Sequence, residues 1–209
     1  MAGNDQQNYD LRAYAVIDSM QPQYAAFLGT EVTGDLPLAT MAELIVEISP
    51  GAGILPLLDI ALKQTSVKPG LQIVEREFGL IELHSFSIAD IQEAGMTILS
   101  GCGLQMNDRK RPKVISSGII TNVSPHQAQL INKSKKGALL LPSESLFTME
   151  VEPAAYITLA ANQTEKVTGM KLIDFSYIGR FGRLLISGME TEIRTARTAA
   201  EEAIRLAQK

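Results

Sequence analysis

The chain has 209 residues, enough for one large domain or two small ones. Hydrophobic residues make up 45% and charged residues 20%, a globular composition that excludes a disordered, collagen-like or coiled-coil protein. The formal net charge of -4 argues against a nucleic-acid-binding protein, which needs a basic surface. No apolar run reaches the roughly 18 residues that span a bilayer, and the polar N-terminus does not resemble a secretory signal. The single cysteine, Cys102, excludes an internal disulfide and fits a cytoplasmic protein.

The sequence contains an internal repeat. Shifting the chain against itself by 103 residues aligns residues 17–79 with residues 120–182 without a gap and gives 15 identities, where composition alone gives about 4. We therefore expect two copies of one domain, over residues 11–103 and 113–209. A polar linker over 104–112 joins them, and a short polar extension over 1–10 precedes them.

Both copies contain the same predicted elements in the same order. A strand comes first, then a short helix with a proline in its first turn, a glycine-bearing loop, a second strand, a helix, two strands joined at a Phe-Gly hinge, and a final helix with a capping-box-like start. This order predicts an α+β fold, in which each copy is an α/β sandwich of ferredoxin-like type with helices against a mostly antiparallel sheet. The predicted strands are 11–19, 43–49, 71–77 and 79–85, then 113–122, 146–152, 171–177 and 182–188. The predicted helix caps are Ser87 with Asp90 and Ser187 with Glu190.

No catalytic constellation is recognisable in the sequence. The two histidines, His84 and His126, are not at equivalent positions and fit capping or surface polarity. Cys102 has no activating basic neighbour, and no metal-ligand spacing occurs. We therefore expect no enzyme activity, no metal and no cofactor.

Two segments could hold an anion. The turn SPGAG at 49–53 precedes a helix and could present backbone N–H groups, but the second copy has EPAA at this place. The basic loop NKSKKG at 132–137 could attract anionic metabolites, although such runs are usually solvated turns. The basic loop leaves open an alternative function, a soluble trimeric small-molecule sensor of ferredoxin-like fold in which a chamber and this loop bind an anionic effector.

Several stretches of the sequence resemble one protein family. They are LRAYAVIDSMQPQ, PGLQIVEREFGLIELHS, HQAQLIN, PAAYITLAAN and GRFGRLLISG. They are similar to segments of the tandem-domain shell proteins of bacterial microcompartments, of the circularly permuted, double-layer type found in carboxysomes. The resemblance runs from about residue 10 to the C-terminus and implies two permuted microcompartment domains per chain.

The resemblance also implies an assembly and a location. Three chains would form a pseudohexameric ring (a homotrimer), two rings would stack face to face into a hexamer, and rings would tile with other shell proteins into a microcompartment shell in the cytoplasm. Neither nucleic acid nor a lipid membrane is an expected partner. The implied function is a structural shell protein with a gated central pore for small anionic metabolites.

Individual residues acquire roles through the same resemblance. The family's gating pair corresponds to Glu75 and Arg76, just before the Phe-Gly hinge, and the equivalent positions in the second copy are Ile178 and Gly179. Only the first copy therefore carries the gate. The remaining implied site residues are Glu77 and Arg180, as further pore lining, and Lys63 and Lys166, as the edge where rings meet.

The gating pair also has a physical interpretation. Three chains would place three Glu75 and three Arg76 around one axis, and a ring of like charges in a narrow pore acts as a selectivity device. Adjacent opposite charges allow two arrangements. Pairs across the axis close the pore, and side chains turned away open it.

Overall fold

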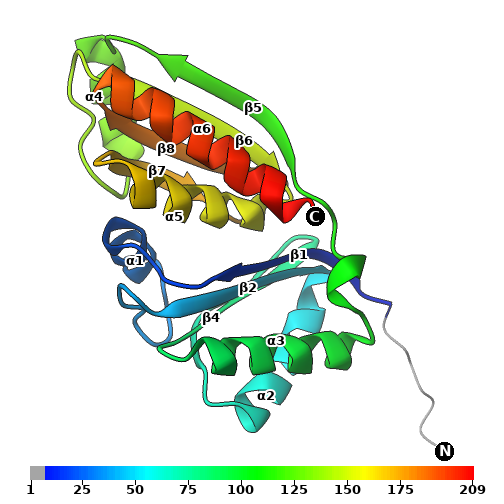
Figure 1. The fold of residues 1–209 in the computed structure, drawn as a ribbon. Helices are drawn as coiled ribbons and strands as arrows, with labels where there is room; N and C mark the ends of the chain where they lie inside the picture. Colours follow the sequence, from blue (N-terminus) through cyan, green and yellow to red (C-terminus); the bar gives the residue numbers. More distant parts are fainter. Residues whose placement is uncertain (1–7) are drawn as a thin grey trace, which may run out of the picture.

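The computed structural model describes residues 8–209 and contains two four-stranded antiparallel sheets, one in each sequence copy (Figure 1). The strand order is β1-β2-β4-β3 in the first sheet and β5-β6-β8-β7 in the second. Most of the extension predicted over 1–10 lies outside the described residues. The two sheets with their helices confirm the predicted α+β fold.

Equivalent elements of the two copies begin at or near a constant spacing of 103 residues. The first copy consists of β1 (Asp10–Ile17), α1 (Pro22–Gly29), β2 (Ala42–Ser49), the 3-10 turn η1 (Gly51–Gly53), α2 (Ile54–Gln64), β3 (Lys68–Glu75), β4 (Phe78–Ser85) and α3 (Ile88–Cys102). The linker contains the 3-10 turn η2 (Met106–Asp108). The second copy consists of β5 (Lys113–Ile120), α4 (Pro125–Ser134), β6 (Ser145–Glu152), η3 (Ala154–Tyr156), α5 (Ile157–Val167), β7 (Lys171–Ser176), β8 (Gly182–Gly188) and α6 (Glu190–Ala207).

The repeated Phe-Gly dipeptide has a packing cause. A Cβ on Gly79 would lie 2.1 Å from the carbonyl oxygen of Gly51, and a Cβ on Gly182 would lie 2.1 Å from that of Ala154. Each glycine therefore lets the last strand of its sheet approach the 3-10 turn before the next helix. Any other residue would push these two segments apart.

The two helix caps were predicted with different success. Ser87 Oγ accepts the Asp90 N–H at 3.3 Å and caps α3, as the sequence indicates. The prediction for the second copy is wrong, because Ser187 stays in β8, where it pairs with Leu146 and Lys171. Helix α6 begins two residues later, and Glu192 accepts the N–H of Met189 at 3.1 Å.

The layers of the two copies are stacked in one direction. Figure 1 shows, from top to bottom, the second sheet with α6 in front of it, helix α5, the first sheet, and helices α2 and α3. Helix α5 thus lies between the two sheets and covers the face of the first sheet that α2 and α3 leave free. The core at this contact joins Ala15, Ile45 and Leu80 of the first copy to Ala160 and Phe175 of the second. None of the helices within residues 8–209 combines the length and the apolar character that a membrane span needs.

Candidate functional site: pore loops and ring-closing surfaces

The contact between the two copies begins at the start of α1. Asn162 Oδ1 accepts the N–H of Gln21 at 2.8 Å, and Glu165 accepts the N–H groups of Gln23 and Tyr24 at 2.8 and 2.9 Å. Both acceptors lie on α5, so the second copy supplies the acceptors that a helix N-terminus needs. Sequence reasoning missed this cap because the two partners are more than 140 residues apart.

Aromatic packing continues the contact along the same helix. Phe175 on β7 stacks on Tyr24 with ring centroids 5.3 Å apart and lies 4.4 Å from the ring of Phe27. All three side chains are buried. Such ring pairs add roughly 0.5–1.5 kcal/mol beyond the area that they bury.

A buried ion pair holds the middle of the contact. Arg12 Nε lies 2.5 Å from Glu47 Oε1, and Glu47 Oε2 accepts the N–H of Ala155 from the second copy at 3.1 Å. The Arg12 guanidinium also lies 3.7 Å above the ring of Phe78. Burial raises the pKa of the Glu47 carboxyl, and the bond from Arg12 opposes this shift.

Several positions that are buried in this contact have exposed apolar equivalents 103 residues away. Phe27 is 3% exposed but its equivalent Leu130 is 65% exposed, and Tyr177 is 4% exposed but its equivalent Val74 is 47% exposed. Thr158 on α5 is fully buried, and its equivalent on α2, Leu55, is 44% exposed. A single chain therefore makes this contact once and leaves one copy of each side of it uncovered.

The predicted gating residues lie on the tight turn between β3 and β4. Glu75 and Phe78 are paired in the ladder, so Arg76 and Glu77 form the turn itself. Glu75, Arg76 and Glu77 are all exposed. Arg76 has a φ of 52°, which glycine adopts far more readily, and its equivalent, Gly179, has a φ of 100°.

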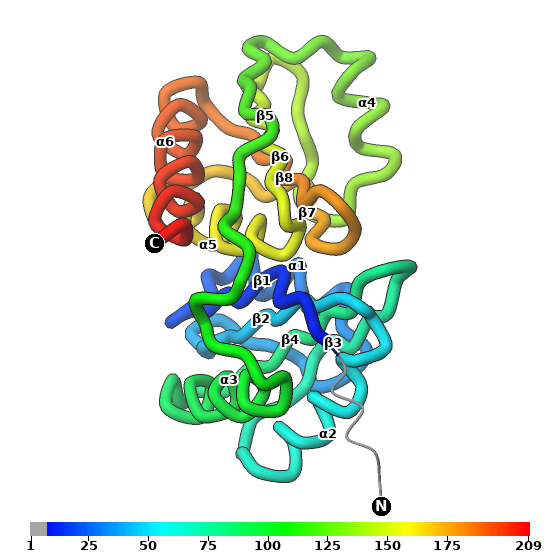
Figure 2. The backbone as a smooth tube through the Cα atoms, turned by 90° about the vertical axis from the view of Figure 1, so that its right-hand side faces the viewer, coloured from blue at the N-terminus to red at the C-terminus, as the bar shows by residue number. Residues whose placement is uncertain are grey.

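The loop between β7 and β8 lies beside this turn. Figure 2 shows both segments close together on its right-hand side, away from α6. Ile178 is half-buried, and Arg180 lies 5.0 Å from the ring of Phe181 and 3.5 Å from Glu152. The fold thus brings Glu75, Ile178 and their neighbours from both copies to one end of the molecule.

A pocket of about 380 Å³ lies between the copies at this end. Its lining includes Glu31 and Glu75 from the first copy and Lys136, Asp174 and Tyr177 from the second. Burial raises the pKa of Asp174, while the nearby Lys136 ammonium opposes the shift. The gating turn therefore borders a polar pocket.

The two segments considered for anion binding have other contacts. Lys136 pairs with Glu31, and Lys135 Nζ donates to the carbonyl of Gly137 at 2.6 Å, so the basic loop is partly neutralised. In the SPGAG turn, Gly51 is buried against Phe78 and Gly79. This turn opens α2 and presents no open cradle.

The predicted edge lysines have different environments. Lys63 pairs with Asp59 of its own helix at 2.5 Å, and its side chain is 71% exposed. Lys166 reaches Asp18 of the other copy at 2.8 Å, and its side chain is only 29% exposed. The position equivalent to Asp18 is Thr121, which offers no charge to Lys63.

Burial explains the environments of His84 and Cys102, whereas His126 is exposed at the start of α4. His84 is 1% exposed and its Nδ1 lies 3.0 Å from Glu82 Oε1, so its expected capping or surface role is wrong. Burial raises the pKa of the Cys102 thiol to about 11, which keeps the reactive thiolate scarce at neutral pH. Sequence reasoning also missed the buried Glu43 and Glu82, although comparison with Leu146 and Leu185 in the second copy marks both as unusual.

Comparison with known proteins identifies the family. The family model of the CsoS1D N-terminal domain matches residues 11–108. The chain is 45% identical to the carboxysome shell protein CcmP of Synechococcus elongatus, over 93% of this chain and 92% of that protein. It is 40% identical to the carboxysome shell protein CsoS1D of Hydrogenovibrio crunogenus, over 94% of this chain and 96% of that protein.

Solved structures agree with this result. The fused permuted hexameric shell protein MSM0275 of the RMM microcompartment superposes with a TM-score of 0.93 at 40% identity, covering 96% of this chain and 98% of that one. The double ringed trimeric shell protein MSM0271 of the same microcompartment has a TM-score of 0.90 at 35% identity, with coverage of 94% and 96%. The chain therefore belongs to the CsoS1D and CcmP family of microcompartment shell proteins.

Proposed function

We propose that the chain acts in a microcompartment shell as a ring of three copies, stacked in a double layer, with a gated pore on the threefold axis. The observation that carries this proposal is the half-used contact between the sequence copies. Each chain makes the contact once internally and exposes one further copy of each of its two sides, with Leu55 on one side and Leu130 on the other. A contact whose two sides differ generates a ring when its rotation closes.

In a closed ring, neighbouring chains would form the same kind of contact that the two copies form within one chain. Helix α2 of one chain would lie on the second sheet of the next chain, as α5 lies on the first sheet within a chain. Asp59 would then occupy the place of Asn162 and accept N–H groups at the start of α4. Three chains would give six similar contacts, three internal and three between chains.

The same rotation would bring the pore loops to the axis. The β3–β4 turn and the β7–β8 loop lie at one side of the molecule, opposite α6 (Figure 2). We propose that Glu75 and Arg76 line and gate the opening, that Glu77, Ile178, Gly179 and Arg180 complete its lining, and that small anionic metabolites pass through it.

A second apolar surface supports the double layer. Leu36 and its equivalent Leu139 are 58% and 56% exposed, and Phe86 and its equivalent Met189 are 69% and 67% exposed. Leu38 and its equivalent Leu141 are also both exposed. Because both members of each pair are exposed, ring closure would not cover them. The segments that carry these residues all lie on the left in Figure 1, opposite the C-terminus.

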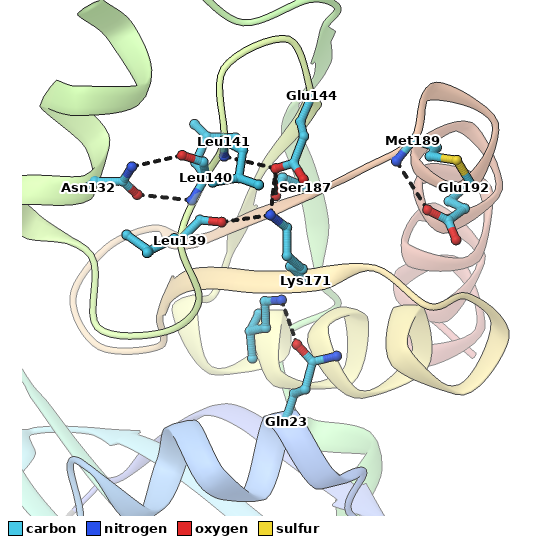
Figure 3. Close-up of polar contacts among 11 residues, drawn as sticks. Gln23, Asn132, Leu139, Leu140, Leu141, Glu144, Lys171, Ser187, Met189 and Glu192 are labelled. Carbon is cyan, nitrogen blue, oxygen red and sulfur yellow. Dashed lines mark hydrogen bonds and ion pairs between the residues drawn. The ribbon is translucent and has the colours of Figure 1, made fainter. Parts of the chain in front are cut away.

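The loop that carries Leu139 and Leu141 is firmly held (Figure 3). Asn132 Nδ2 donates to the carbonyl of Leu140 at 2.8 Å, and Asn132 Oδ1 accepts the Leu140 N–H at 3.0 Å. Glu144 accepts the Leu141 N–H at 2.9 Å and pairs with Lys171 at 2.7 Å. A rigid loop presents its apolar side chains at a low entropic cost, as a docking surface requires. We propose that an identical face of a second ring covers it.

The relatives support this proposal over a sensor function. One is described as double ringed and trimeric, and two are carboxysome shell proteins. The alternative of an anionic effector at the basic loop is weakened because Lys136 already pairs with Glu31.

The ring is tested by Leu130→Asp, with Met96→Asp as the matched control. Leu130 lies on the ring-closing side, whereas Met96 is equally exposed, at 63%, on α3. We expect light scattering to give single chains for Leu130→Asp and the unchanged assembly for Met96→Asp. A Leu130→Asp protein with the wild-type mass would contradict ring closure through this surface.

A further inference from the structure

Glu43 stands out among the carboxylates at the contact between the two copies. It lies on β2, is 0% exposed, and faces the second copy together with Ile45 and Glu47. Its Oε2 accepts the Tyr24 hydroxyl at 2.8 Å. Its Oε1 is buried and has no hydrogen-bond partner among residues 8–209.

The other acids at this contact each have a compensating partner. Glu47 has Arg12, Glu31 has Lys136, and Glu165 has the N–H groups at the start of α1. Glu82 has His84 and the N–H of Gly70. In the described part of the chain, the only donor to Glu43 is the Tyr24 hydroxyl, from which a neutral acid can accept equally well.

Within residues 8–209, no lysine or arginine donates a hydrogen bond to the buried Oε1 of Glu43. Glu43 and His84 are paired across β2 and β4, but His84 Nδ1 is directed to Glu82. Lys68 is paired with His84 from β3, but it is exposed. From the second copy, Tyr177 lies directly after β7, and burial raises the pKa of its hydroxyl, so it is neutral at ordinary pH. Burial and the neighbouring Glu82 charge raise the pKa of Glu43 well above its usual range.

We propose that docking of the two copies is proton-dependent: Glu43 is a neutral carboxylic acid while the second copy is docked on the first sheet, and ionisation of Glu43 loosens β7 and α1. Tyr24 connects Glu43 directly to the second copy, because its hydroxyl donates to Glu43 and its ring stacks on Phe175 of β7. An ionised Glu43 would need water, and water reaches it only when β7 and α1 separate from the sheet.

Comparison with the second copy indicates that the proton dependence is limited to the contact within one chain. Leu146 and Leu185 stand at the positions equivalent to Glu43 and Glu82, so the sheet face that would meet another chain is apolar there. Proton loss would therefore loosen the contact within a chain and spare the contact between chains.

The sign of the pH effect follows from the raised pKa. The docked state holds a proton that the opened state releases, so docking is strongest at low pH. It weakens as the pH rises from the ordinary range of a glutamic acid to the raised pKa of Glu43. One proton changes the opening equilibrium by about tenfold per pH unit at most.

Hydrogen exchange on the intact assembly, followed by mass spectrometry between pH 5.5 and 8.5, tests the proposal. After correction for the intrinsic rate, protection of the β7 and α1 peptides should fall as the pH rises, and protection of the α6 peptides should not. Glu43→Gln should abolish this dependence, because the amide keeps the shape of the neutral acid. Glu93→Gln, on the exposed side of α3, should behave as the wild type.

A second measurement tests the protonation of Glu43 even if the Glu43→Gln variant folds poorly. The infrared band of a protonated carboxyl should be present in the wild type at neutral pH and absent in Glu43→Leu. Leucine is chosen because it occupies the equivalent position, 146, in the second copy. The proposal is overturned if the wild type has no such band, or if Glu43→Gln keeps the wild-type pH dependence. Neither result bears on ring formation, which the mass of the assembly reports separately.

Discussion

Glu47 of the first copy accepts the backbone N–H of Ala155 in the second copy while its other oxygen binds Arg12. One carboxylate thus joins β1, β2 and the turn before α5. Glu47→Ala would leave the Arg12 guanidinium buried without a counter-charge and the Ala155 N–H without an acceptor. We expect it to lower the free energy of unfolding by about 3–5 kcal/mol.

Denaturant titration at a fixed protein concentration measures this effect. The control is Glu190→Ala, which removes an exposed pair with Arg194 on α6 and should change the stability by less than about 1 kcal/mol. Equal effects of the two substitutions would show that Glu47 is no more than a surface charge.

The double layer should depend on the exposed leucines of the two equivalent loops. Each chain contributes four, Leu36, Leu38, Leu139 and Leu141, so a ring of three would present twelve. Replacing Leu36 and Leu139 with Asp places like charges on facing rings and exchanges apolar contact for hydration. We expect the mass in light scattering to fall from six chains to three.

Leu206 provides the comparison for this experiment. It is 50% exposed near the C-terminus, on the opposite side in Figure 1. Leu206→Asp should leave the mass unchanged. If the loop variant also keeps the mass of six chains, the leucine loops are not the stacking surface.

The gate should respond to the charge of residue 76. Arg76→Ala would remove the proposed pairing across the axis and leave three Glu75 carboxylates, which would repel one another in a narrow opening. We expect an open pore in a structure of the variant and slower anion flux through reconstituted shells, because the remaining ring is negative.

Two further substitutions distinguish the effect of the Arg76 charge from the effect of its backbone conformation. Arg76→Gly also removes the charge but suits the φ of 52°, as Gly179 does in the second copy, and should open the pore equally. Arg76→Lys keeps the charge and should keep the closed arrangement accessible. A pore that stays sealed in both neutral variants would assign the gate to other residues.

The edge lysines should contribute unequally to tiling. Lys63→Glu changes an exposed side chain, whereas Lys166→Glu places a carboxylate beside Asp18 and weakens docking of the two copies. We expect Lys63→Glu to abolish sheets in electron microscopy at unchanged melting temperature. Lys166→Glu should lower the melting temperature by a few degrees. Normal sheets from Lys63→Glu would refute its assignment to the edge.

The duplication made most of the fold predictable. The 15 identities place strands and helices in both copies because each element has the same cause in each, such as Pro22 and Pro125 at the first helical position. The start of α6 was misplaced because Ser187 resembles a cap locally but pairs in the sheet.

The site was only partly predictable for a different reason. The sequence places Glu75 and Arg76 just before the Phe-Gly hinge, and their gating role stays a prediction. The burial of Glu43 and His84 and the ion pair of Lys166 with Asp18 depend on which copy covers which. The sequence repeat cannot indicate which copy covers the other, because equivalent positions in the two copies have the same pattern. Phe27 is buried where Leu130 is exposed, because Phe175 of the second copy packs on Phe27.

Joining two domains in one chain has a consequence for the opening itself. In a ring of six identical single domains, every residue at the centre would occur six times, and six arginines would be crowded into one narrow opening. Here the turn with Arg76 would alternate with a loop that carries Gly179, which has no side chain. Joining the two domains would thus halve the number of Glu75 and Arg76 side chains at the constriction and leave space beside Gly179 into which each Arg76 side chain can turn.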